Sequence, residues 1–237
     1  MLNFLRKLRK KENRTSQYMK YAIGEILLVV VGILIALSID NANEQYKNKQ
    51  KAKLTLEILK EEVNENLRLL QEDFTDNTEL LDSLNIYLNS NLVKERDIDK
   101  AVFISRLLNY NWDILNYPTV EQELGPVRVV QFNPELNALL KELKSAHSAY
   151  NFQLNYLNEL FNNKTVPFLL EAGAGTGLIN SMFFYGEEVD KLAALYNTEP
   201  LNNILSIQQL FLISYNNRIA RLMEESETVL EYLSGFE

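Results

Sequence analysis

Cysteine is absent from this chain of 237 residues, and histidine, tryptophan, glycine and proline are scarce. Without cysteine the chain forms no disulfide bond and no metal site built on thiolates. The single histidine, His147, has no second histidine with which to complete the Glu-x-x-His pairs of a di-iron bundle. We therefore expect His147 to be a packed or exposed helical side chain and not a metal ligand. The 8 glycines and 5 prolines are few, which favours long helices over sheets.

The charges of the chain are unevenly distributed. Residues 1–20 carry 7 basic side chains and one acidic side chain, whereas residues 41–237 have a net charge of −12. A nucleic-acid-binding domain presents a basic surface, so this acidic balance argues against a nucleic-acid partner. The basic N-terminal segment favours a cytoplasmic N-terminus if a membrane helix follows it.

One long apolar run, residues 22–39, follows the basic segment, and it is interrupted only by Glu25 and Ser38. A helix of 18 residues reaches about 27 Å, which is enough for the hydrocarbon layer of a membrane. We predict a transmembrane helix over residues 21–40. A cleaved signal peptide is the competing interpretation, because the sequence also has the basic, apolar and Ala36-Leu37-Ser38 regions of such a peptide. Both the basic segment and the apolar run are longer than a signal peptide needs.

Small residues lie on one face of the predicted membrane helix. Gly32 and Ala36 form a small-xxx-small pair, and Glu25 lies on the same face seven residues before Gly32. Small side chains let a second helix approach closely, and a carboxyl group near the helix end can meet a donor on that helix. We predict a packing face formed by Gly24, Glu25, Gly32 and Ala36. In the alternative interpretation Glu25 reaches the lipid headgroups and the glycines have no packing role.

A long helix is expected directly after the membrane segment. No glycine or proline occurs from Asn43 to Asn89, and apolar residues recur at steps of three and four, with Asn66 and Asn77 on the same stripe. The apolar members of this stripe are Leu56, Leu59, Val63, Leu70, Phe74, Leu81, Leu84 and Leu88. The stripe predicts a seam that packs against later helices of the chain or against a second copy, since a buried asparagine can fix the register of a coiled coil.

Capping signals place further helices along the chain. Asp97 or Asp99 can cap a helix that runs to Asn109, and Thr119-Val-Glu-Gln122 is a capping box for a short helix that stops at Gly125-Pro126. An extended stretch is predicted over 127–132. A helix over 133–162 follows it, with Asn133 as its cap and Pro134 in its first turn. After Val166-Pro167 we expect an irregular stretch, and then helices over 187–196 and 201–233. We therefore predict an all-α fold, with an N-terminal transmembrane helix (21–40) between a basic cytoplasmic segment (1–20) and an elongated acidic helical bundle (41–237).

A glycine-rich motif, Leu169-Leu-Glu171-Ala-Gly173-Ala-Gly175-Thr-Gly177, is similar to the first motif of class I methyltransferases, which binds S-adenosylmethionine. That motif requires a buried strand before the glycines and an alternating α/β domain around them. Pro167 interrupts the required strand, and only sixty residues follow Gly177. A loop between bundle helices is therefore the preferred interpretation.

Two further groups of side chains are candidate sites. Glu57, Glu61 and Glu65 would suit acid–base chemistry if they were buried together, but nearby lysine and arginine residues favour a solvated helix face. Aromatic residues cluster in two segments, and we expect most of them to pack in the core. The alternative is an apolar patch for a partner or a small ligand. These aromatic residues are Tyr110, Trp112 and Tyr117, followed by Tyr150, Phe152, Tyr156, Phe161, Phe168, Phe183, Phe184 and Tyr185.

The run from Tyr21 to Leu37, which follows the basic start, resembles the opening of an uncharacterised family of single-pass membrane proteins from the Bacteroidota, known as a domain of unknown function. A later segment is also similar, at Thr119, Leu124, Gly125, Val127, Val129, Val130, Asn133, Glu135 and Leu136. Ala42 stands where the family usually has tryptophan, and Gly125-Pro126 replaces its Ser-Gly turn. The resemblance implies an inner-membrane location and no known activity.

Together these features predict a non-enzymatic interaction or scaffold module anchored in the bacterial inner membrane, with its C-terminal domain in the periplasm. We expect no cofactor and no metal. The expected partners are the lipid bilayer and either a second copy or another envelope membrane protein. The two alternatives are an extracytoplasmic sensory bundle that binds a small molecule, and an S-adenosylmethionine-dependent methyltransferase that faces the cytoplasm.

Overall fold

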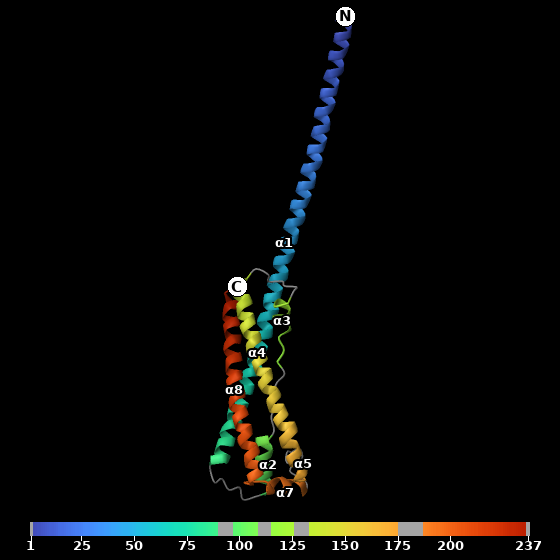
Figure 1. Cartoon of the computed structure of the whole chain (residues 1–237). Coiled ribbons are helices and arrows are strands. Elements are labelled where there is room, and N and C mark those ends of the chain that lie inside the picture. The colour runs from blue at the N-terminus through green and yellow to red at the C-terminus, as the bar shows by residue number, and fades with distance from the viewer. Residues whose placement is uncertain (1, 90–96, 109–114, 126–132, 175–186, 236–237) are drawn as a thin grey trace. The chain divides into compact units, whose positions relative to one another are not determined.

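The chain is helical throughout most of the computed structural model, which describes residues 2–89, 97–108, 115–125, 133–174 and 187–235 (Figure 1). Within these ranges no strand occurs, so the predicted all-α fold is confirmed. The elements are α1 (Leu2–Asn89), α2 (Asp97–Leu108), α3 (Pro118–Glu123), α4 (Pro134–Leu160), the π-helical turn η1 (Phe161–Thr165), α5 (Val166–Glu171), α7 (Glu187–Ala194) and α8 (Glu199–Ser234). The extended stretch expected over 127–132 lies outside the described residues.

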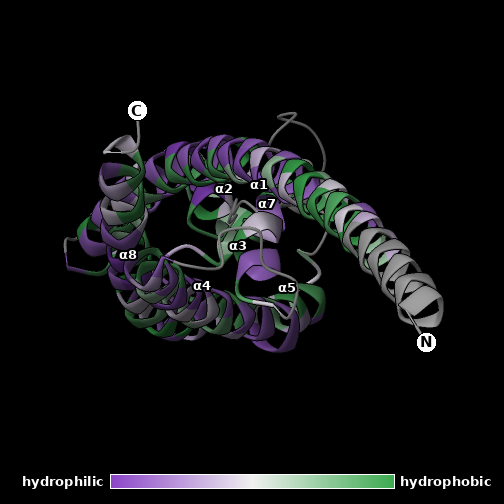
Figure 2. Ribbon diagram, turned by 90° about the horizontal axis from the view of Figure 1, so that it is seen from above, coloured by the Kyte–Doolittle hydropathy of each residue, from purple (hydrophilic) through white to green (hydrophobic). Residues whose placement is uncertain are grey.

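The chain divides into two compact units, Met1–Leu54 and Thr55–Glu237, and α1 contributes to both. In the first unit every side chain of residues 21–50 is exposed. The apolar run lies in this part of α1, as the green stretch of ribbon in Figure 2 shows. The helix is therefore long and apolar enough to cross a membrane. The domain limits expected at residues 20 and 40 stay predictions.

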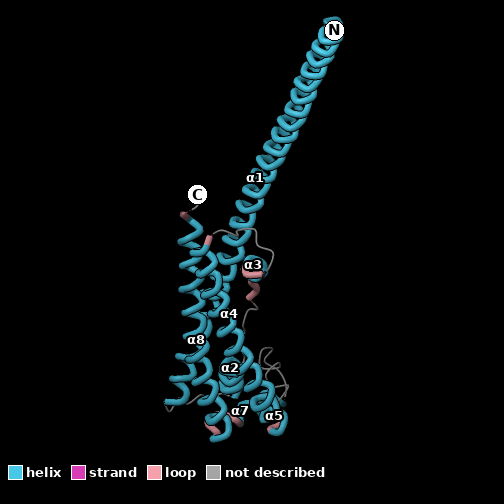
Figure 3. The backbone as a smooth tube through the Cα atoms, turned by 45° about the horizontal axis from the view of Figure 1, so that its top comes forward, coloured by secondary structure: helices cyan, strands magenta, loops and turns pink. Residues whose placement is uncertain are grey.

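The second unit is a bundle of three long helices, which are the C-terminal part of α1, α4 and α8 (Figure 3). Helices α4 and α8 are antiparallel and pack against each other along most of their length, as Figure 1 shows. Helix α2 packs mainly against α7, and the short helix α3 contacts α4. One continuous set of buried apolar side chains, from Leu59 to Leu233, holds these helices together.

The apolar stripe predicted on α1 lies against this core. Four of its apolar members are fully buried, namely Leu59, Val63, Leu70 and Leu84. The other four are partly buried and pack against the core, namely Leu56, Phe74, Leu81 and Leu88. Asn66 and Asn77 are also buried, as their place on the stripe predicts. The partners of the stripe include later helices of the same chain, which is one of the two arrangements expected.

Most predicted helix ends agree with the structure within two residues. Asn133 caps α4 as expected, because its side-chain oxygen accepts a hydrogen bond of 3.0 Å from the Leu136 N–H. Helix α2 begins at Asp97, so Asp99 lies inside the helix and is not its cap. Helix α8 begins at Glu199, before the expected start, because Pro200 fits the first turn of a helix.

The irregular stretch expected directly after Val166-Pro167 is wrong for its first residues, because the chain stays helical to Glu171. Residues 172–174 are non-helical as expected, and residues 175–186 of this stretch lie outside the described residues. A proline inside an α-helix clashes with the carbonyl group four residues earlier and donates no hydrogen bond. Here the wider turn η1 precedes Pro167, and the Val166 N–H bonds to the Phe161 carbonyl five residues earlier. This π turn lets Pro167 enter the first turn of α5 without ending the helix.

The capping box expected at Thr119 and Gln122 is also wrong. Helix α3 begins at Pro118, and no side chain of its own first turn caps it. The carboxylate of Glu62, on α1, takes this role instead and accepts hydrogen bonds from the Thr119 N–H at 2.8 Å and the Val120 N–H at 3.3 Å. A negative charge at this position also favours the positive end of the α3 dipole.

We predict that Glu62→Ala lowers the free energy of unfolding by about 0.5–2 kcal/mol, because two N–H groups of α3 lose their acceptor. The matched control is Glu61→Ala, which removes the same charge from an exposed neighbour on α1 and should change stability by less than about 0.5 kcal/mol. Urea denaturation of the full chain in detergent, followed by circular dichroism, measures both. Equal effects of the two substitutions would contradict the capping role of Glu62.

Candidate functional site

The predicted packing face on α1 is exposed in the structure. Gly24, Glu25, Gly32 and Ala36 all lie in the exposed part of this helix. A Cβ atom added at Gly24 or Gly32 would meet no atom within 4 Å. The surface at both glycines is therefore free for a second helix, and the use of this face stays a prediction.

A cluster of three polar side chains lies inside the bundle and joins its three long helices. Asp73 comes from α1, Tyr150 from α4 and Tyr215 from α8. Both tyrosines are 0% exposed and Asp73 is 5% exposed. The Tyr150 hydroxyl donates a hydrogen bond of 3.3 Å to Oδ2 of Asp73, and the Tyr215 hydroxyl lies 3.3 Å from the same oxygen. The two hydroxyl oxygens are 2.9 Å apart.

Burial raises the pKa of Tyr215 far above its usual value, and Tyr150 and Asp73 raise it further. The phenol is therefore neutral near neutral pH and can donate a hydrogen bond. Next to the cluster, the Asn77 side chain donates to the backbone carbonyl of Asp73 at 2.8 Å. These groups satisfy one another inside the core, which suits a structural role in fixing helix register more than contact with a substrate.

The sequence contains a signal for this cluster. Asp73 lies on the α1 stripe, three residues after Leu70 and four before Asn77, at a position where an apolar residue is usual. A charged residue at such a position needs a partner in the core. Tyr150 belongs to the aromatic group expected in the core, whereas nothing in the sequence pairs Tyr215 with Asp73.

His147 is half-buried on α4, and its ring lies against the edge of Tyr117 with a centroid distance of 4.8 Å. Its Nε2 lies 3.0 Å from the side-chain nitrogen of Asn151. Burial lowers the pKa of His147 below 6.5, and a hydrogen bond to the Leu115 backbone partly offsets this effect. The expectation of a packed helical histidine is therefore confirmed. Among the described residues, no three acidic or histidine side chains gather as a candidate metal site.

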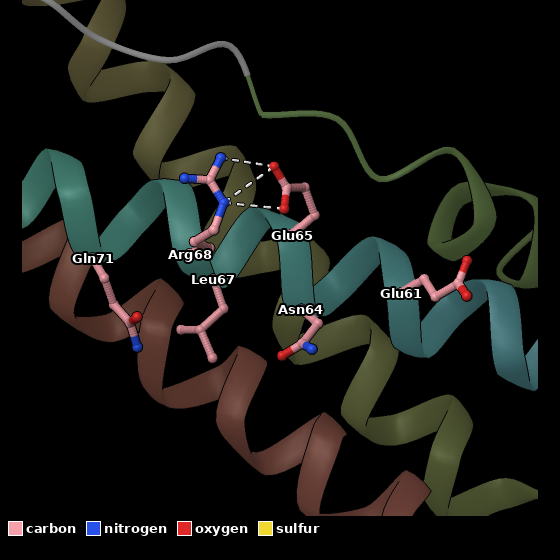
Figure 4. A pocket seen from close by; sticks show the side chains of 6 residues that line it. All are labelled: Glu61, Asn64, Glu65, Leu67, Arg68 and Gln71. Atoms are coloured by element: carbon pink, nitrogen blue, oxygen red, sulfur yellow. Dashed lines mark hydrogen bonds and ion pairs between the residues drawn. The ribbon is translucent and has the colours of Figure 1, made fainter.

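A hollow of about 550 Å³ lies beside α1 and is lined by polar side chains around Leu67 (Figure 4). The Arg68 guanidinium donates to both carboxylate oxygens of Glu65 and to Glu72. These bonds hold the pKa of Glu65 below its usual value. Since Arg68 is already paired with two carboxylates, the hollow offers no strong site for an anion.

The carboxylates at Glu57, Glu61 and Glu65 are all exposed, so the expected solvated helix face is confirmed. Only Glu62, which lies beside them, is partly buried, and it caps α3 as described above.

The glycine-rich motif begins at the end of a helix. Leu169 and Glu171 belong to α5, and Gly173 has a φ of 67°. The Ala174 N–H bonds to the Leu169 carbonyl at 2.8 Å, and the Gly173 N–H bonds to the Leu170 carbonyl at 3.0 Å, which is the Schellman arrangement of a helix C-terminus. The strand that a methyltransferase motif requires is therefore a helix here, and Gly173 ends it. Gly175 and Gly177 lie outside the described residues.

The aromatic residues divide between core and surface. Tyr117 and Tyr150 are buried as expected, whereas Phe152 and Tyr156 are exposed on α4. Tyr110, Trp112, Phe183, Phe184 and Tyr185 lie outside the described residues.

We predict that Tyr215→Phe lowers the free energy of unfolding by about 1–3 kcal/mol, because the buried Asp73 carboxylate loses a donor. Tyr156→Phe removes a hydroxyl from an exposed tyrosine and should have an effect of less than about 0.5 kcal/mol. Denaturation curves of the two variants and of the unchanged chain measure the difference. An unchanged midpoint for Tyr215→Phe would show that the cluster adds no stability.

We also predict that stability falls as the pH decreases below about 6.5. The folded state disfavours protonated His147, so the unfolded chain binds the proton at a higher pH than the folded chain does. Because His147 is the single histidine, NMR titration of ¹³C-labelled histidine should give one pKa below 6.5. The variant His147→Gln should weaken the dependence of stability on pH below about 6.5. A titration at or above the ordinary value would contradict this prediction.

Comparison with known proteins gives a match to a family model. No curated protein and no solved structure matches the chain. The matching model is that of a family of unknown function, DUF6090, and it covers residues 25–175. This range begins inside the apolar run of α1 and ends just after α5. Because it covers more than half of the chain, the chain belongs to the DUF6090 family.

Proposed function

We propose that this chain is a non-enzymatic interaction or scaffold module of the bacterial cell envelope, held at the inner membrane by a single helix. One observation carries the proposal: the apolar run of α1 is exposed along its whole length. Exposure of so many large apolar side chains to water is unfavourable by roughly 25 cal/mol per Å², so this surface needs lipid or protein around it.

The direction of insertion follows from the basic residues. Seven lysine or arginine side chains precede the apolar run, and four lysines, at positions 47, 49, 51 and 53, follow it. The larger number before the run supports a cytoplasmic N-terminus and a periplasmic bundle. We extend the same arrangement to the family, as single-pass membrane proteins of the Bacteroidota.

The polar groups of the described bundle that form hydrogen bonds or ion pairs with one another support a structural role and not a catalytic one. In the core, Asp73 forms hydrogen bonds with two tyrosines, and on the surface Arg68 is paired with Glu65 and Glu72. Groups that are already satisfied in this way give stability and a fixed shape. Within the membrane, Glu25, Gly32 and Ala36 would let the anchor pack against the helix of another copy or another envelope protein.

Topology is the first test of this proposal. Alkaline phosphatase, active only outside the cytoplasm, and a green fluorescent protein that fluoresces only inside it are each fused after Glu237 in the full chain. We expect phosphatase activity and no fluorescence, because the basic segment holds the N-terminus inside. The control variant replaces Arg6, Lys7, Arg9, Lys10 and Lys11 with glutamine, and it should lower the exported fraction.

A fluorescent and phosphatase-inactive C-terminus would overturn the proposed topology. Chemical crosslinking in membranes tests the interaction role itself. If neither a homo-oligomer nor a second protein is recovered, the scaffold role is wrong.

A further inference from the structure

A group of large apolar side chains lies on the outer surface of the bundle, where α4 and α8 pack against each other. We name it the α4/α8 patch and define it as Phe152, Tyr156, Ile207, Leu210 and Phe211. Phe152 is 62% exposed and Leu210 is 68% exposed, and only Phe211 is half-buried. No other part of the described bundle surface brings exposed aromatic rings into contact with one another.

The patch is an ordered surface, because its rings contact one another across the two helices. The rings of Phe152 and Tyr156 meet edge to face at 4.9 Å, and those of Tyr156 and Phe211 stack at 6.0 Å. Beneath them, the Gln153 side chain donates to the Phe211 carbonyl at 3.2 Å and accepts from the Ser214 hydroxyl at 3.2 Å. These hydrogen bonds fix the relative position of α4 and α8, so the rings are held in place before any partner binds.

The five side chains of the patch are uncharged, and charge is sparse around them: the exposed Glu159 on α4, three residues after Tyr156, lies at the edge of the patch. No acidic or basic residue occurs on α4 between Lys144 and Glu159, apart from His147, or on α8 between Glu199 and Arg218. The uncharged positions around the patch are filled instead by asparagine, glutamine and serine. An apolar centre rich in aromatic residues, depleted of charge and surrounded by polar side chains is the usual composition of a protein–protein interface.

We propose that the α4/α8 patch binds the same patch of a second copy of the chain, so that membrane-anchored copies pair through their bundles. This inference rests on the proposed function, which supplies the anchor, and it names the partner and the surface. Residues 41–237 carry a net charge of −12, so two copies repel each other over most of their surfaces. A two-fold contact places identical surfaces together, and five uncharged side chains make this possible without opposing like charges at the centre of the contact.

The small size of the patch favours a partner that is anchored in the same membrane over a partner that is free in solution. Five side chains over about two helical turns cover a few hundred Å², which is below the roughly 800 Å² per partner of a stable interface between free proteins. A contact of this size is weak in solution. Two copies held in one membrane meet at a much higher effective concentration, and a weak contact is then enough for pairing.

The absence of cysteine allows a direct test with the full chain in liposomes. Ile207→Cys introduces a single thiol in the patch, and a short bismaleimide then links two copies whose patches are in contact. Leu170→Cys is the matched control, because Leu170 is 65% exposed on α5 and lies outside the patch. We expect a crosslinked dimer from Ile207→Cys and little or none from Leu170→Cys.

A second change tests whether the patch itself drives pairing. Leu210→Glu places a charge at a side chain that is already exposed, so the fold should remain intact, as circular dichroism would verify. On the Ile207→Cys background it should reduce the dimer yield at least tenfold. Leu170→Glu, at a leucine of nearly equal exposure, should leave the yield unchanged.

Each contrary result has a distinct meaning. An unchanged yield with Leu210→Glu would overturn pairing through the patch. If Gly32→Leu abolishes dimers while Leu210→Glu does not, copies associate through the membrane helix, so the patch inference is wrong and the proposed function stands. A crosslink from Ile207→Cys in native membranes to a different protein, without a homodimer, would also overturn the second copy as partner. Failure to recover any partner by any crosslinker would overturn both proposals.

Discussion

One buried acidic side chain joins the three long helices of the bundle. Asp73 lies in the core of the bundle, where a polar side chain without partners would be strongly destabilising, and one hydroxyl group from each of α4 and α8 lies within hydrogen-bond distance of it. The three side chains meet only if α1, α4 and α8 have one relative position along their axes. Apolar side chains alone tolerate a shift of one helix along another, whereas this cluster does not. The carboxylate therefore makes the bundle specific as well as compact.

The structure agrees with the sequence-based predictions where they rest on local patterns, and differs from them where a contact joins residues far apart in the chain. Local signals, such as the α1 stripe and the Asn133 cap, depend on residues within one or two turns, and the structure agrees with them. The Glu62 cap of α3 joins groups 57 residues apart, and local spacing contains no information about such a contact. The continuation of the helix past Pro167 depends on a change of hydrogen-bond pattern in the preceding turn, which residue propensities do not predict.

The two candidate binding surfaces, the membrane packing face and the α4/α8 patch, differ in how far the sequence predicts them. The sequence predicts the membrane packing face from the spacing of small residues, because spacing alone defines a helix face. It indicates an aromatic group around Tyr156 but cannot separate core rings from surface rings, since that distinction depends on where α8 lies. Phe152 and Tyr150 are two residues apart, yet one is exposed and the other is fully buried.

The π turn between α4 and α5 has a consequence for how this chain can be compared with others of its family. Buried positions follow α4 at steps of three and four up to Leu160, and the next ones are Thr165 and Leu169. The step of five at the turn means that one residue is extra relative to a regular helix. A chain without this residue would have to rotate α5 by about 100° to keep an unbroken α-helix, which would turn Leu169 away from the core. One extra residue in η1 therefore decides which face of α5 points to the core. In an alignment of the family we expect gaps within the continuous helical segment from α4 to α5, and not only in loops.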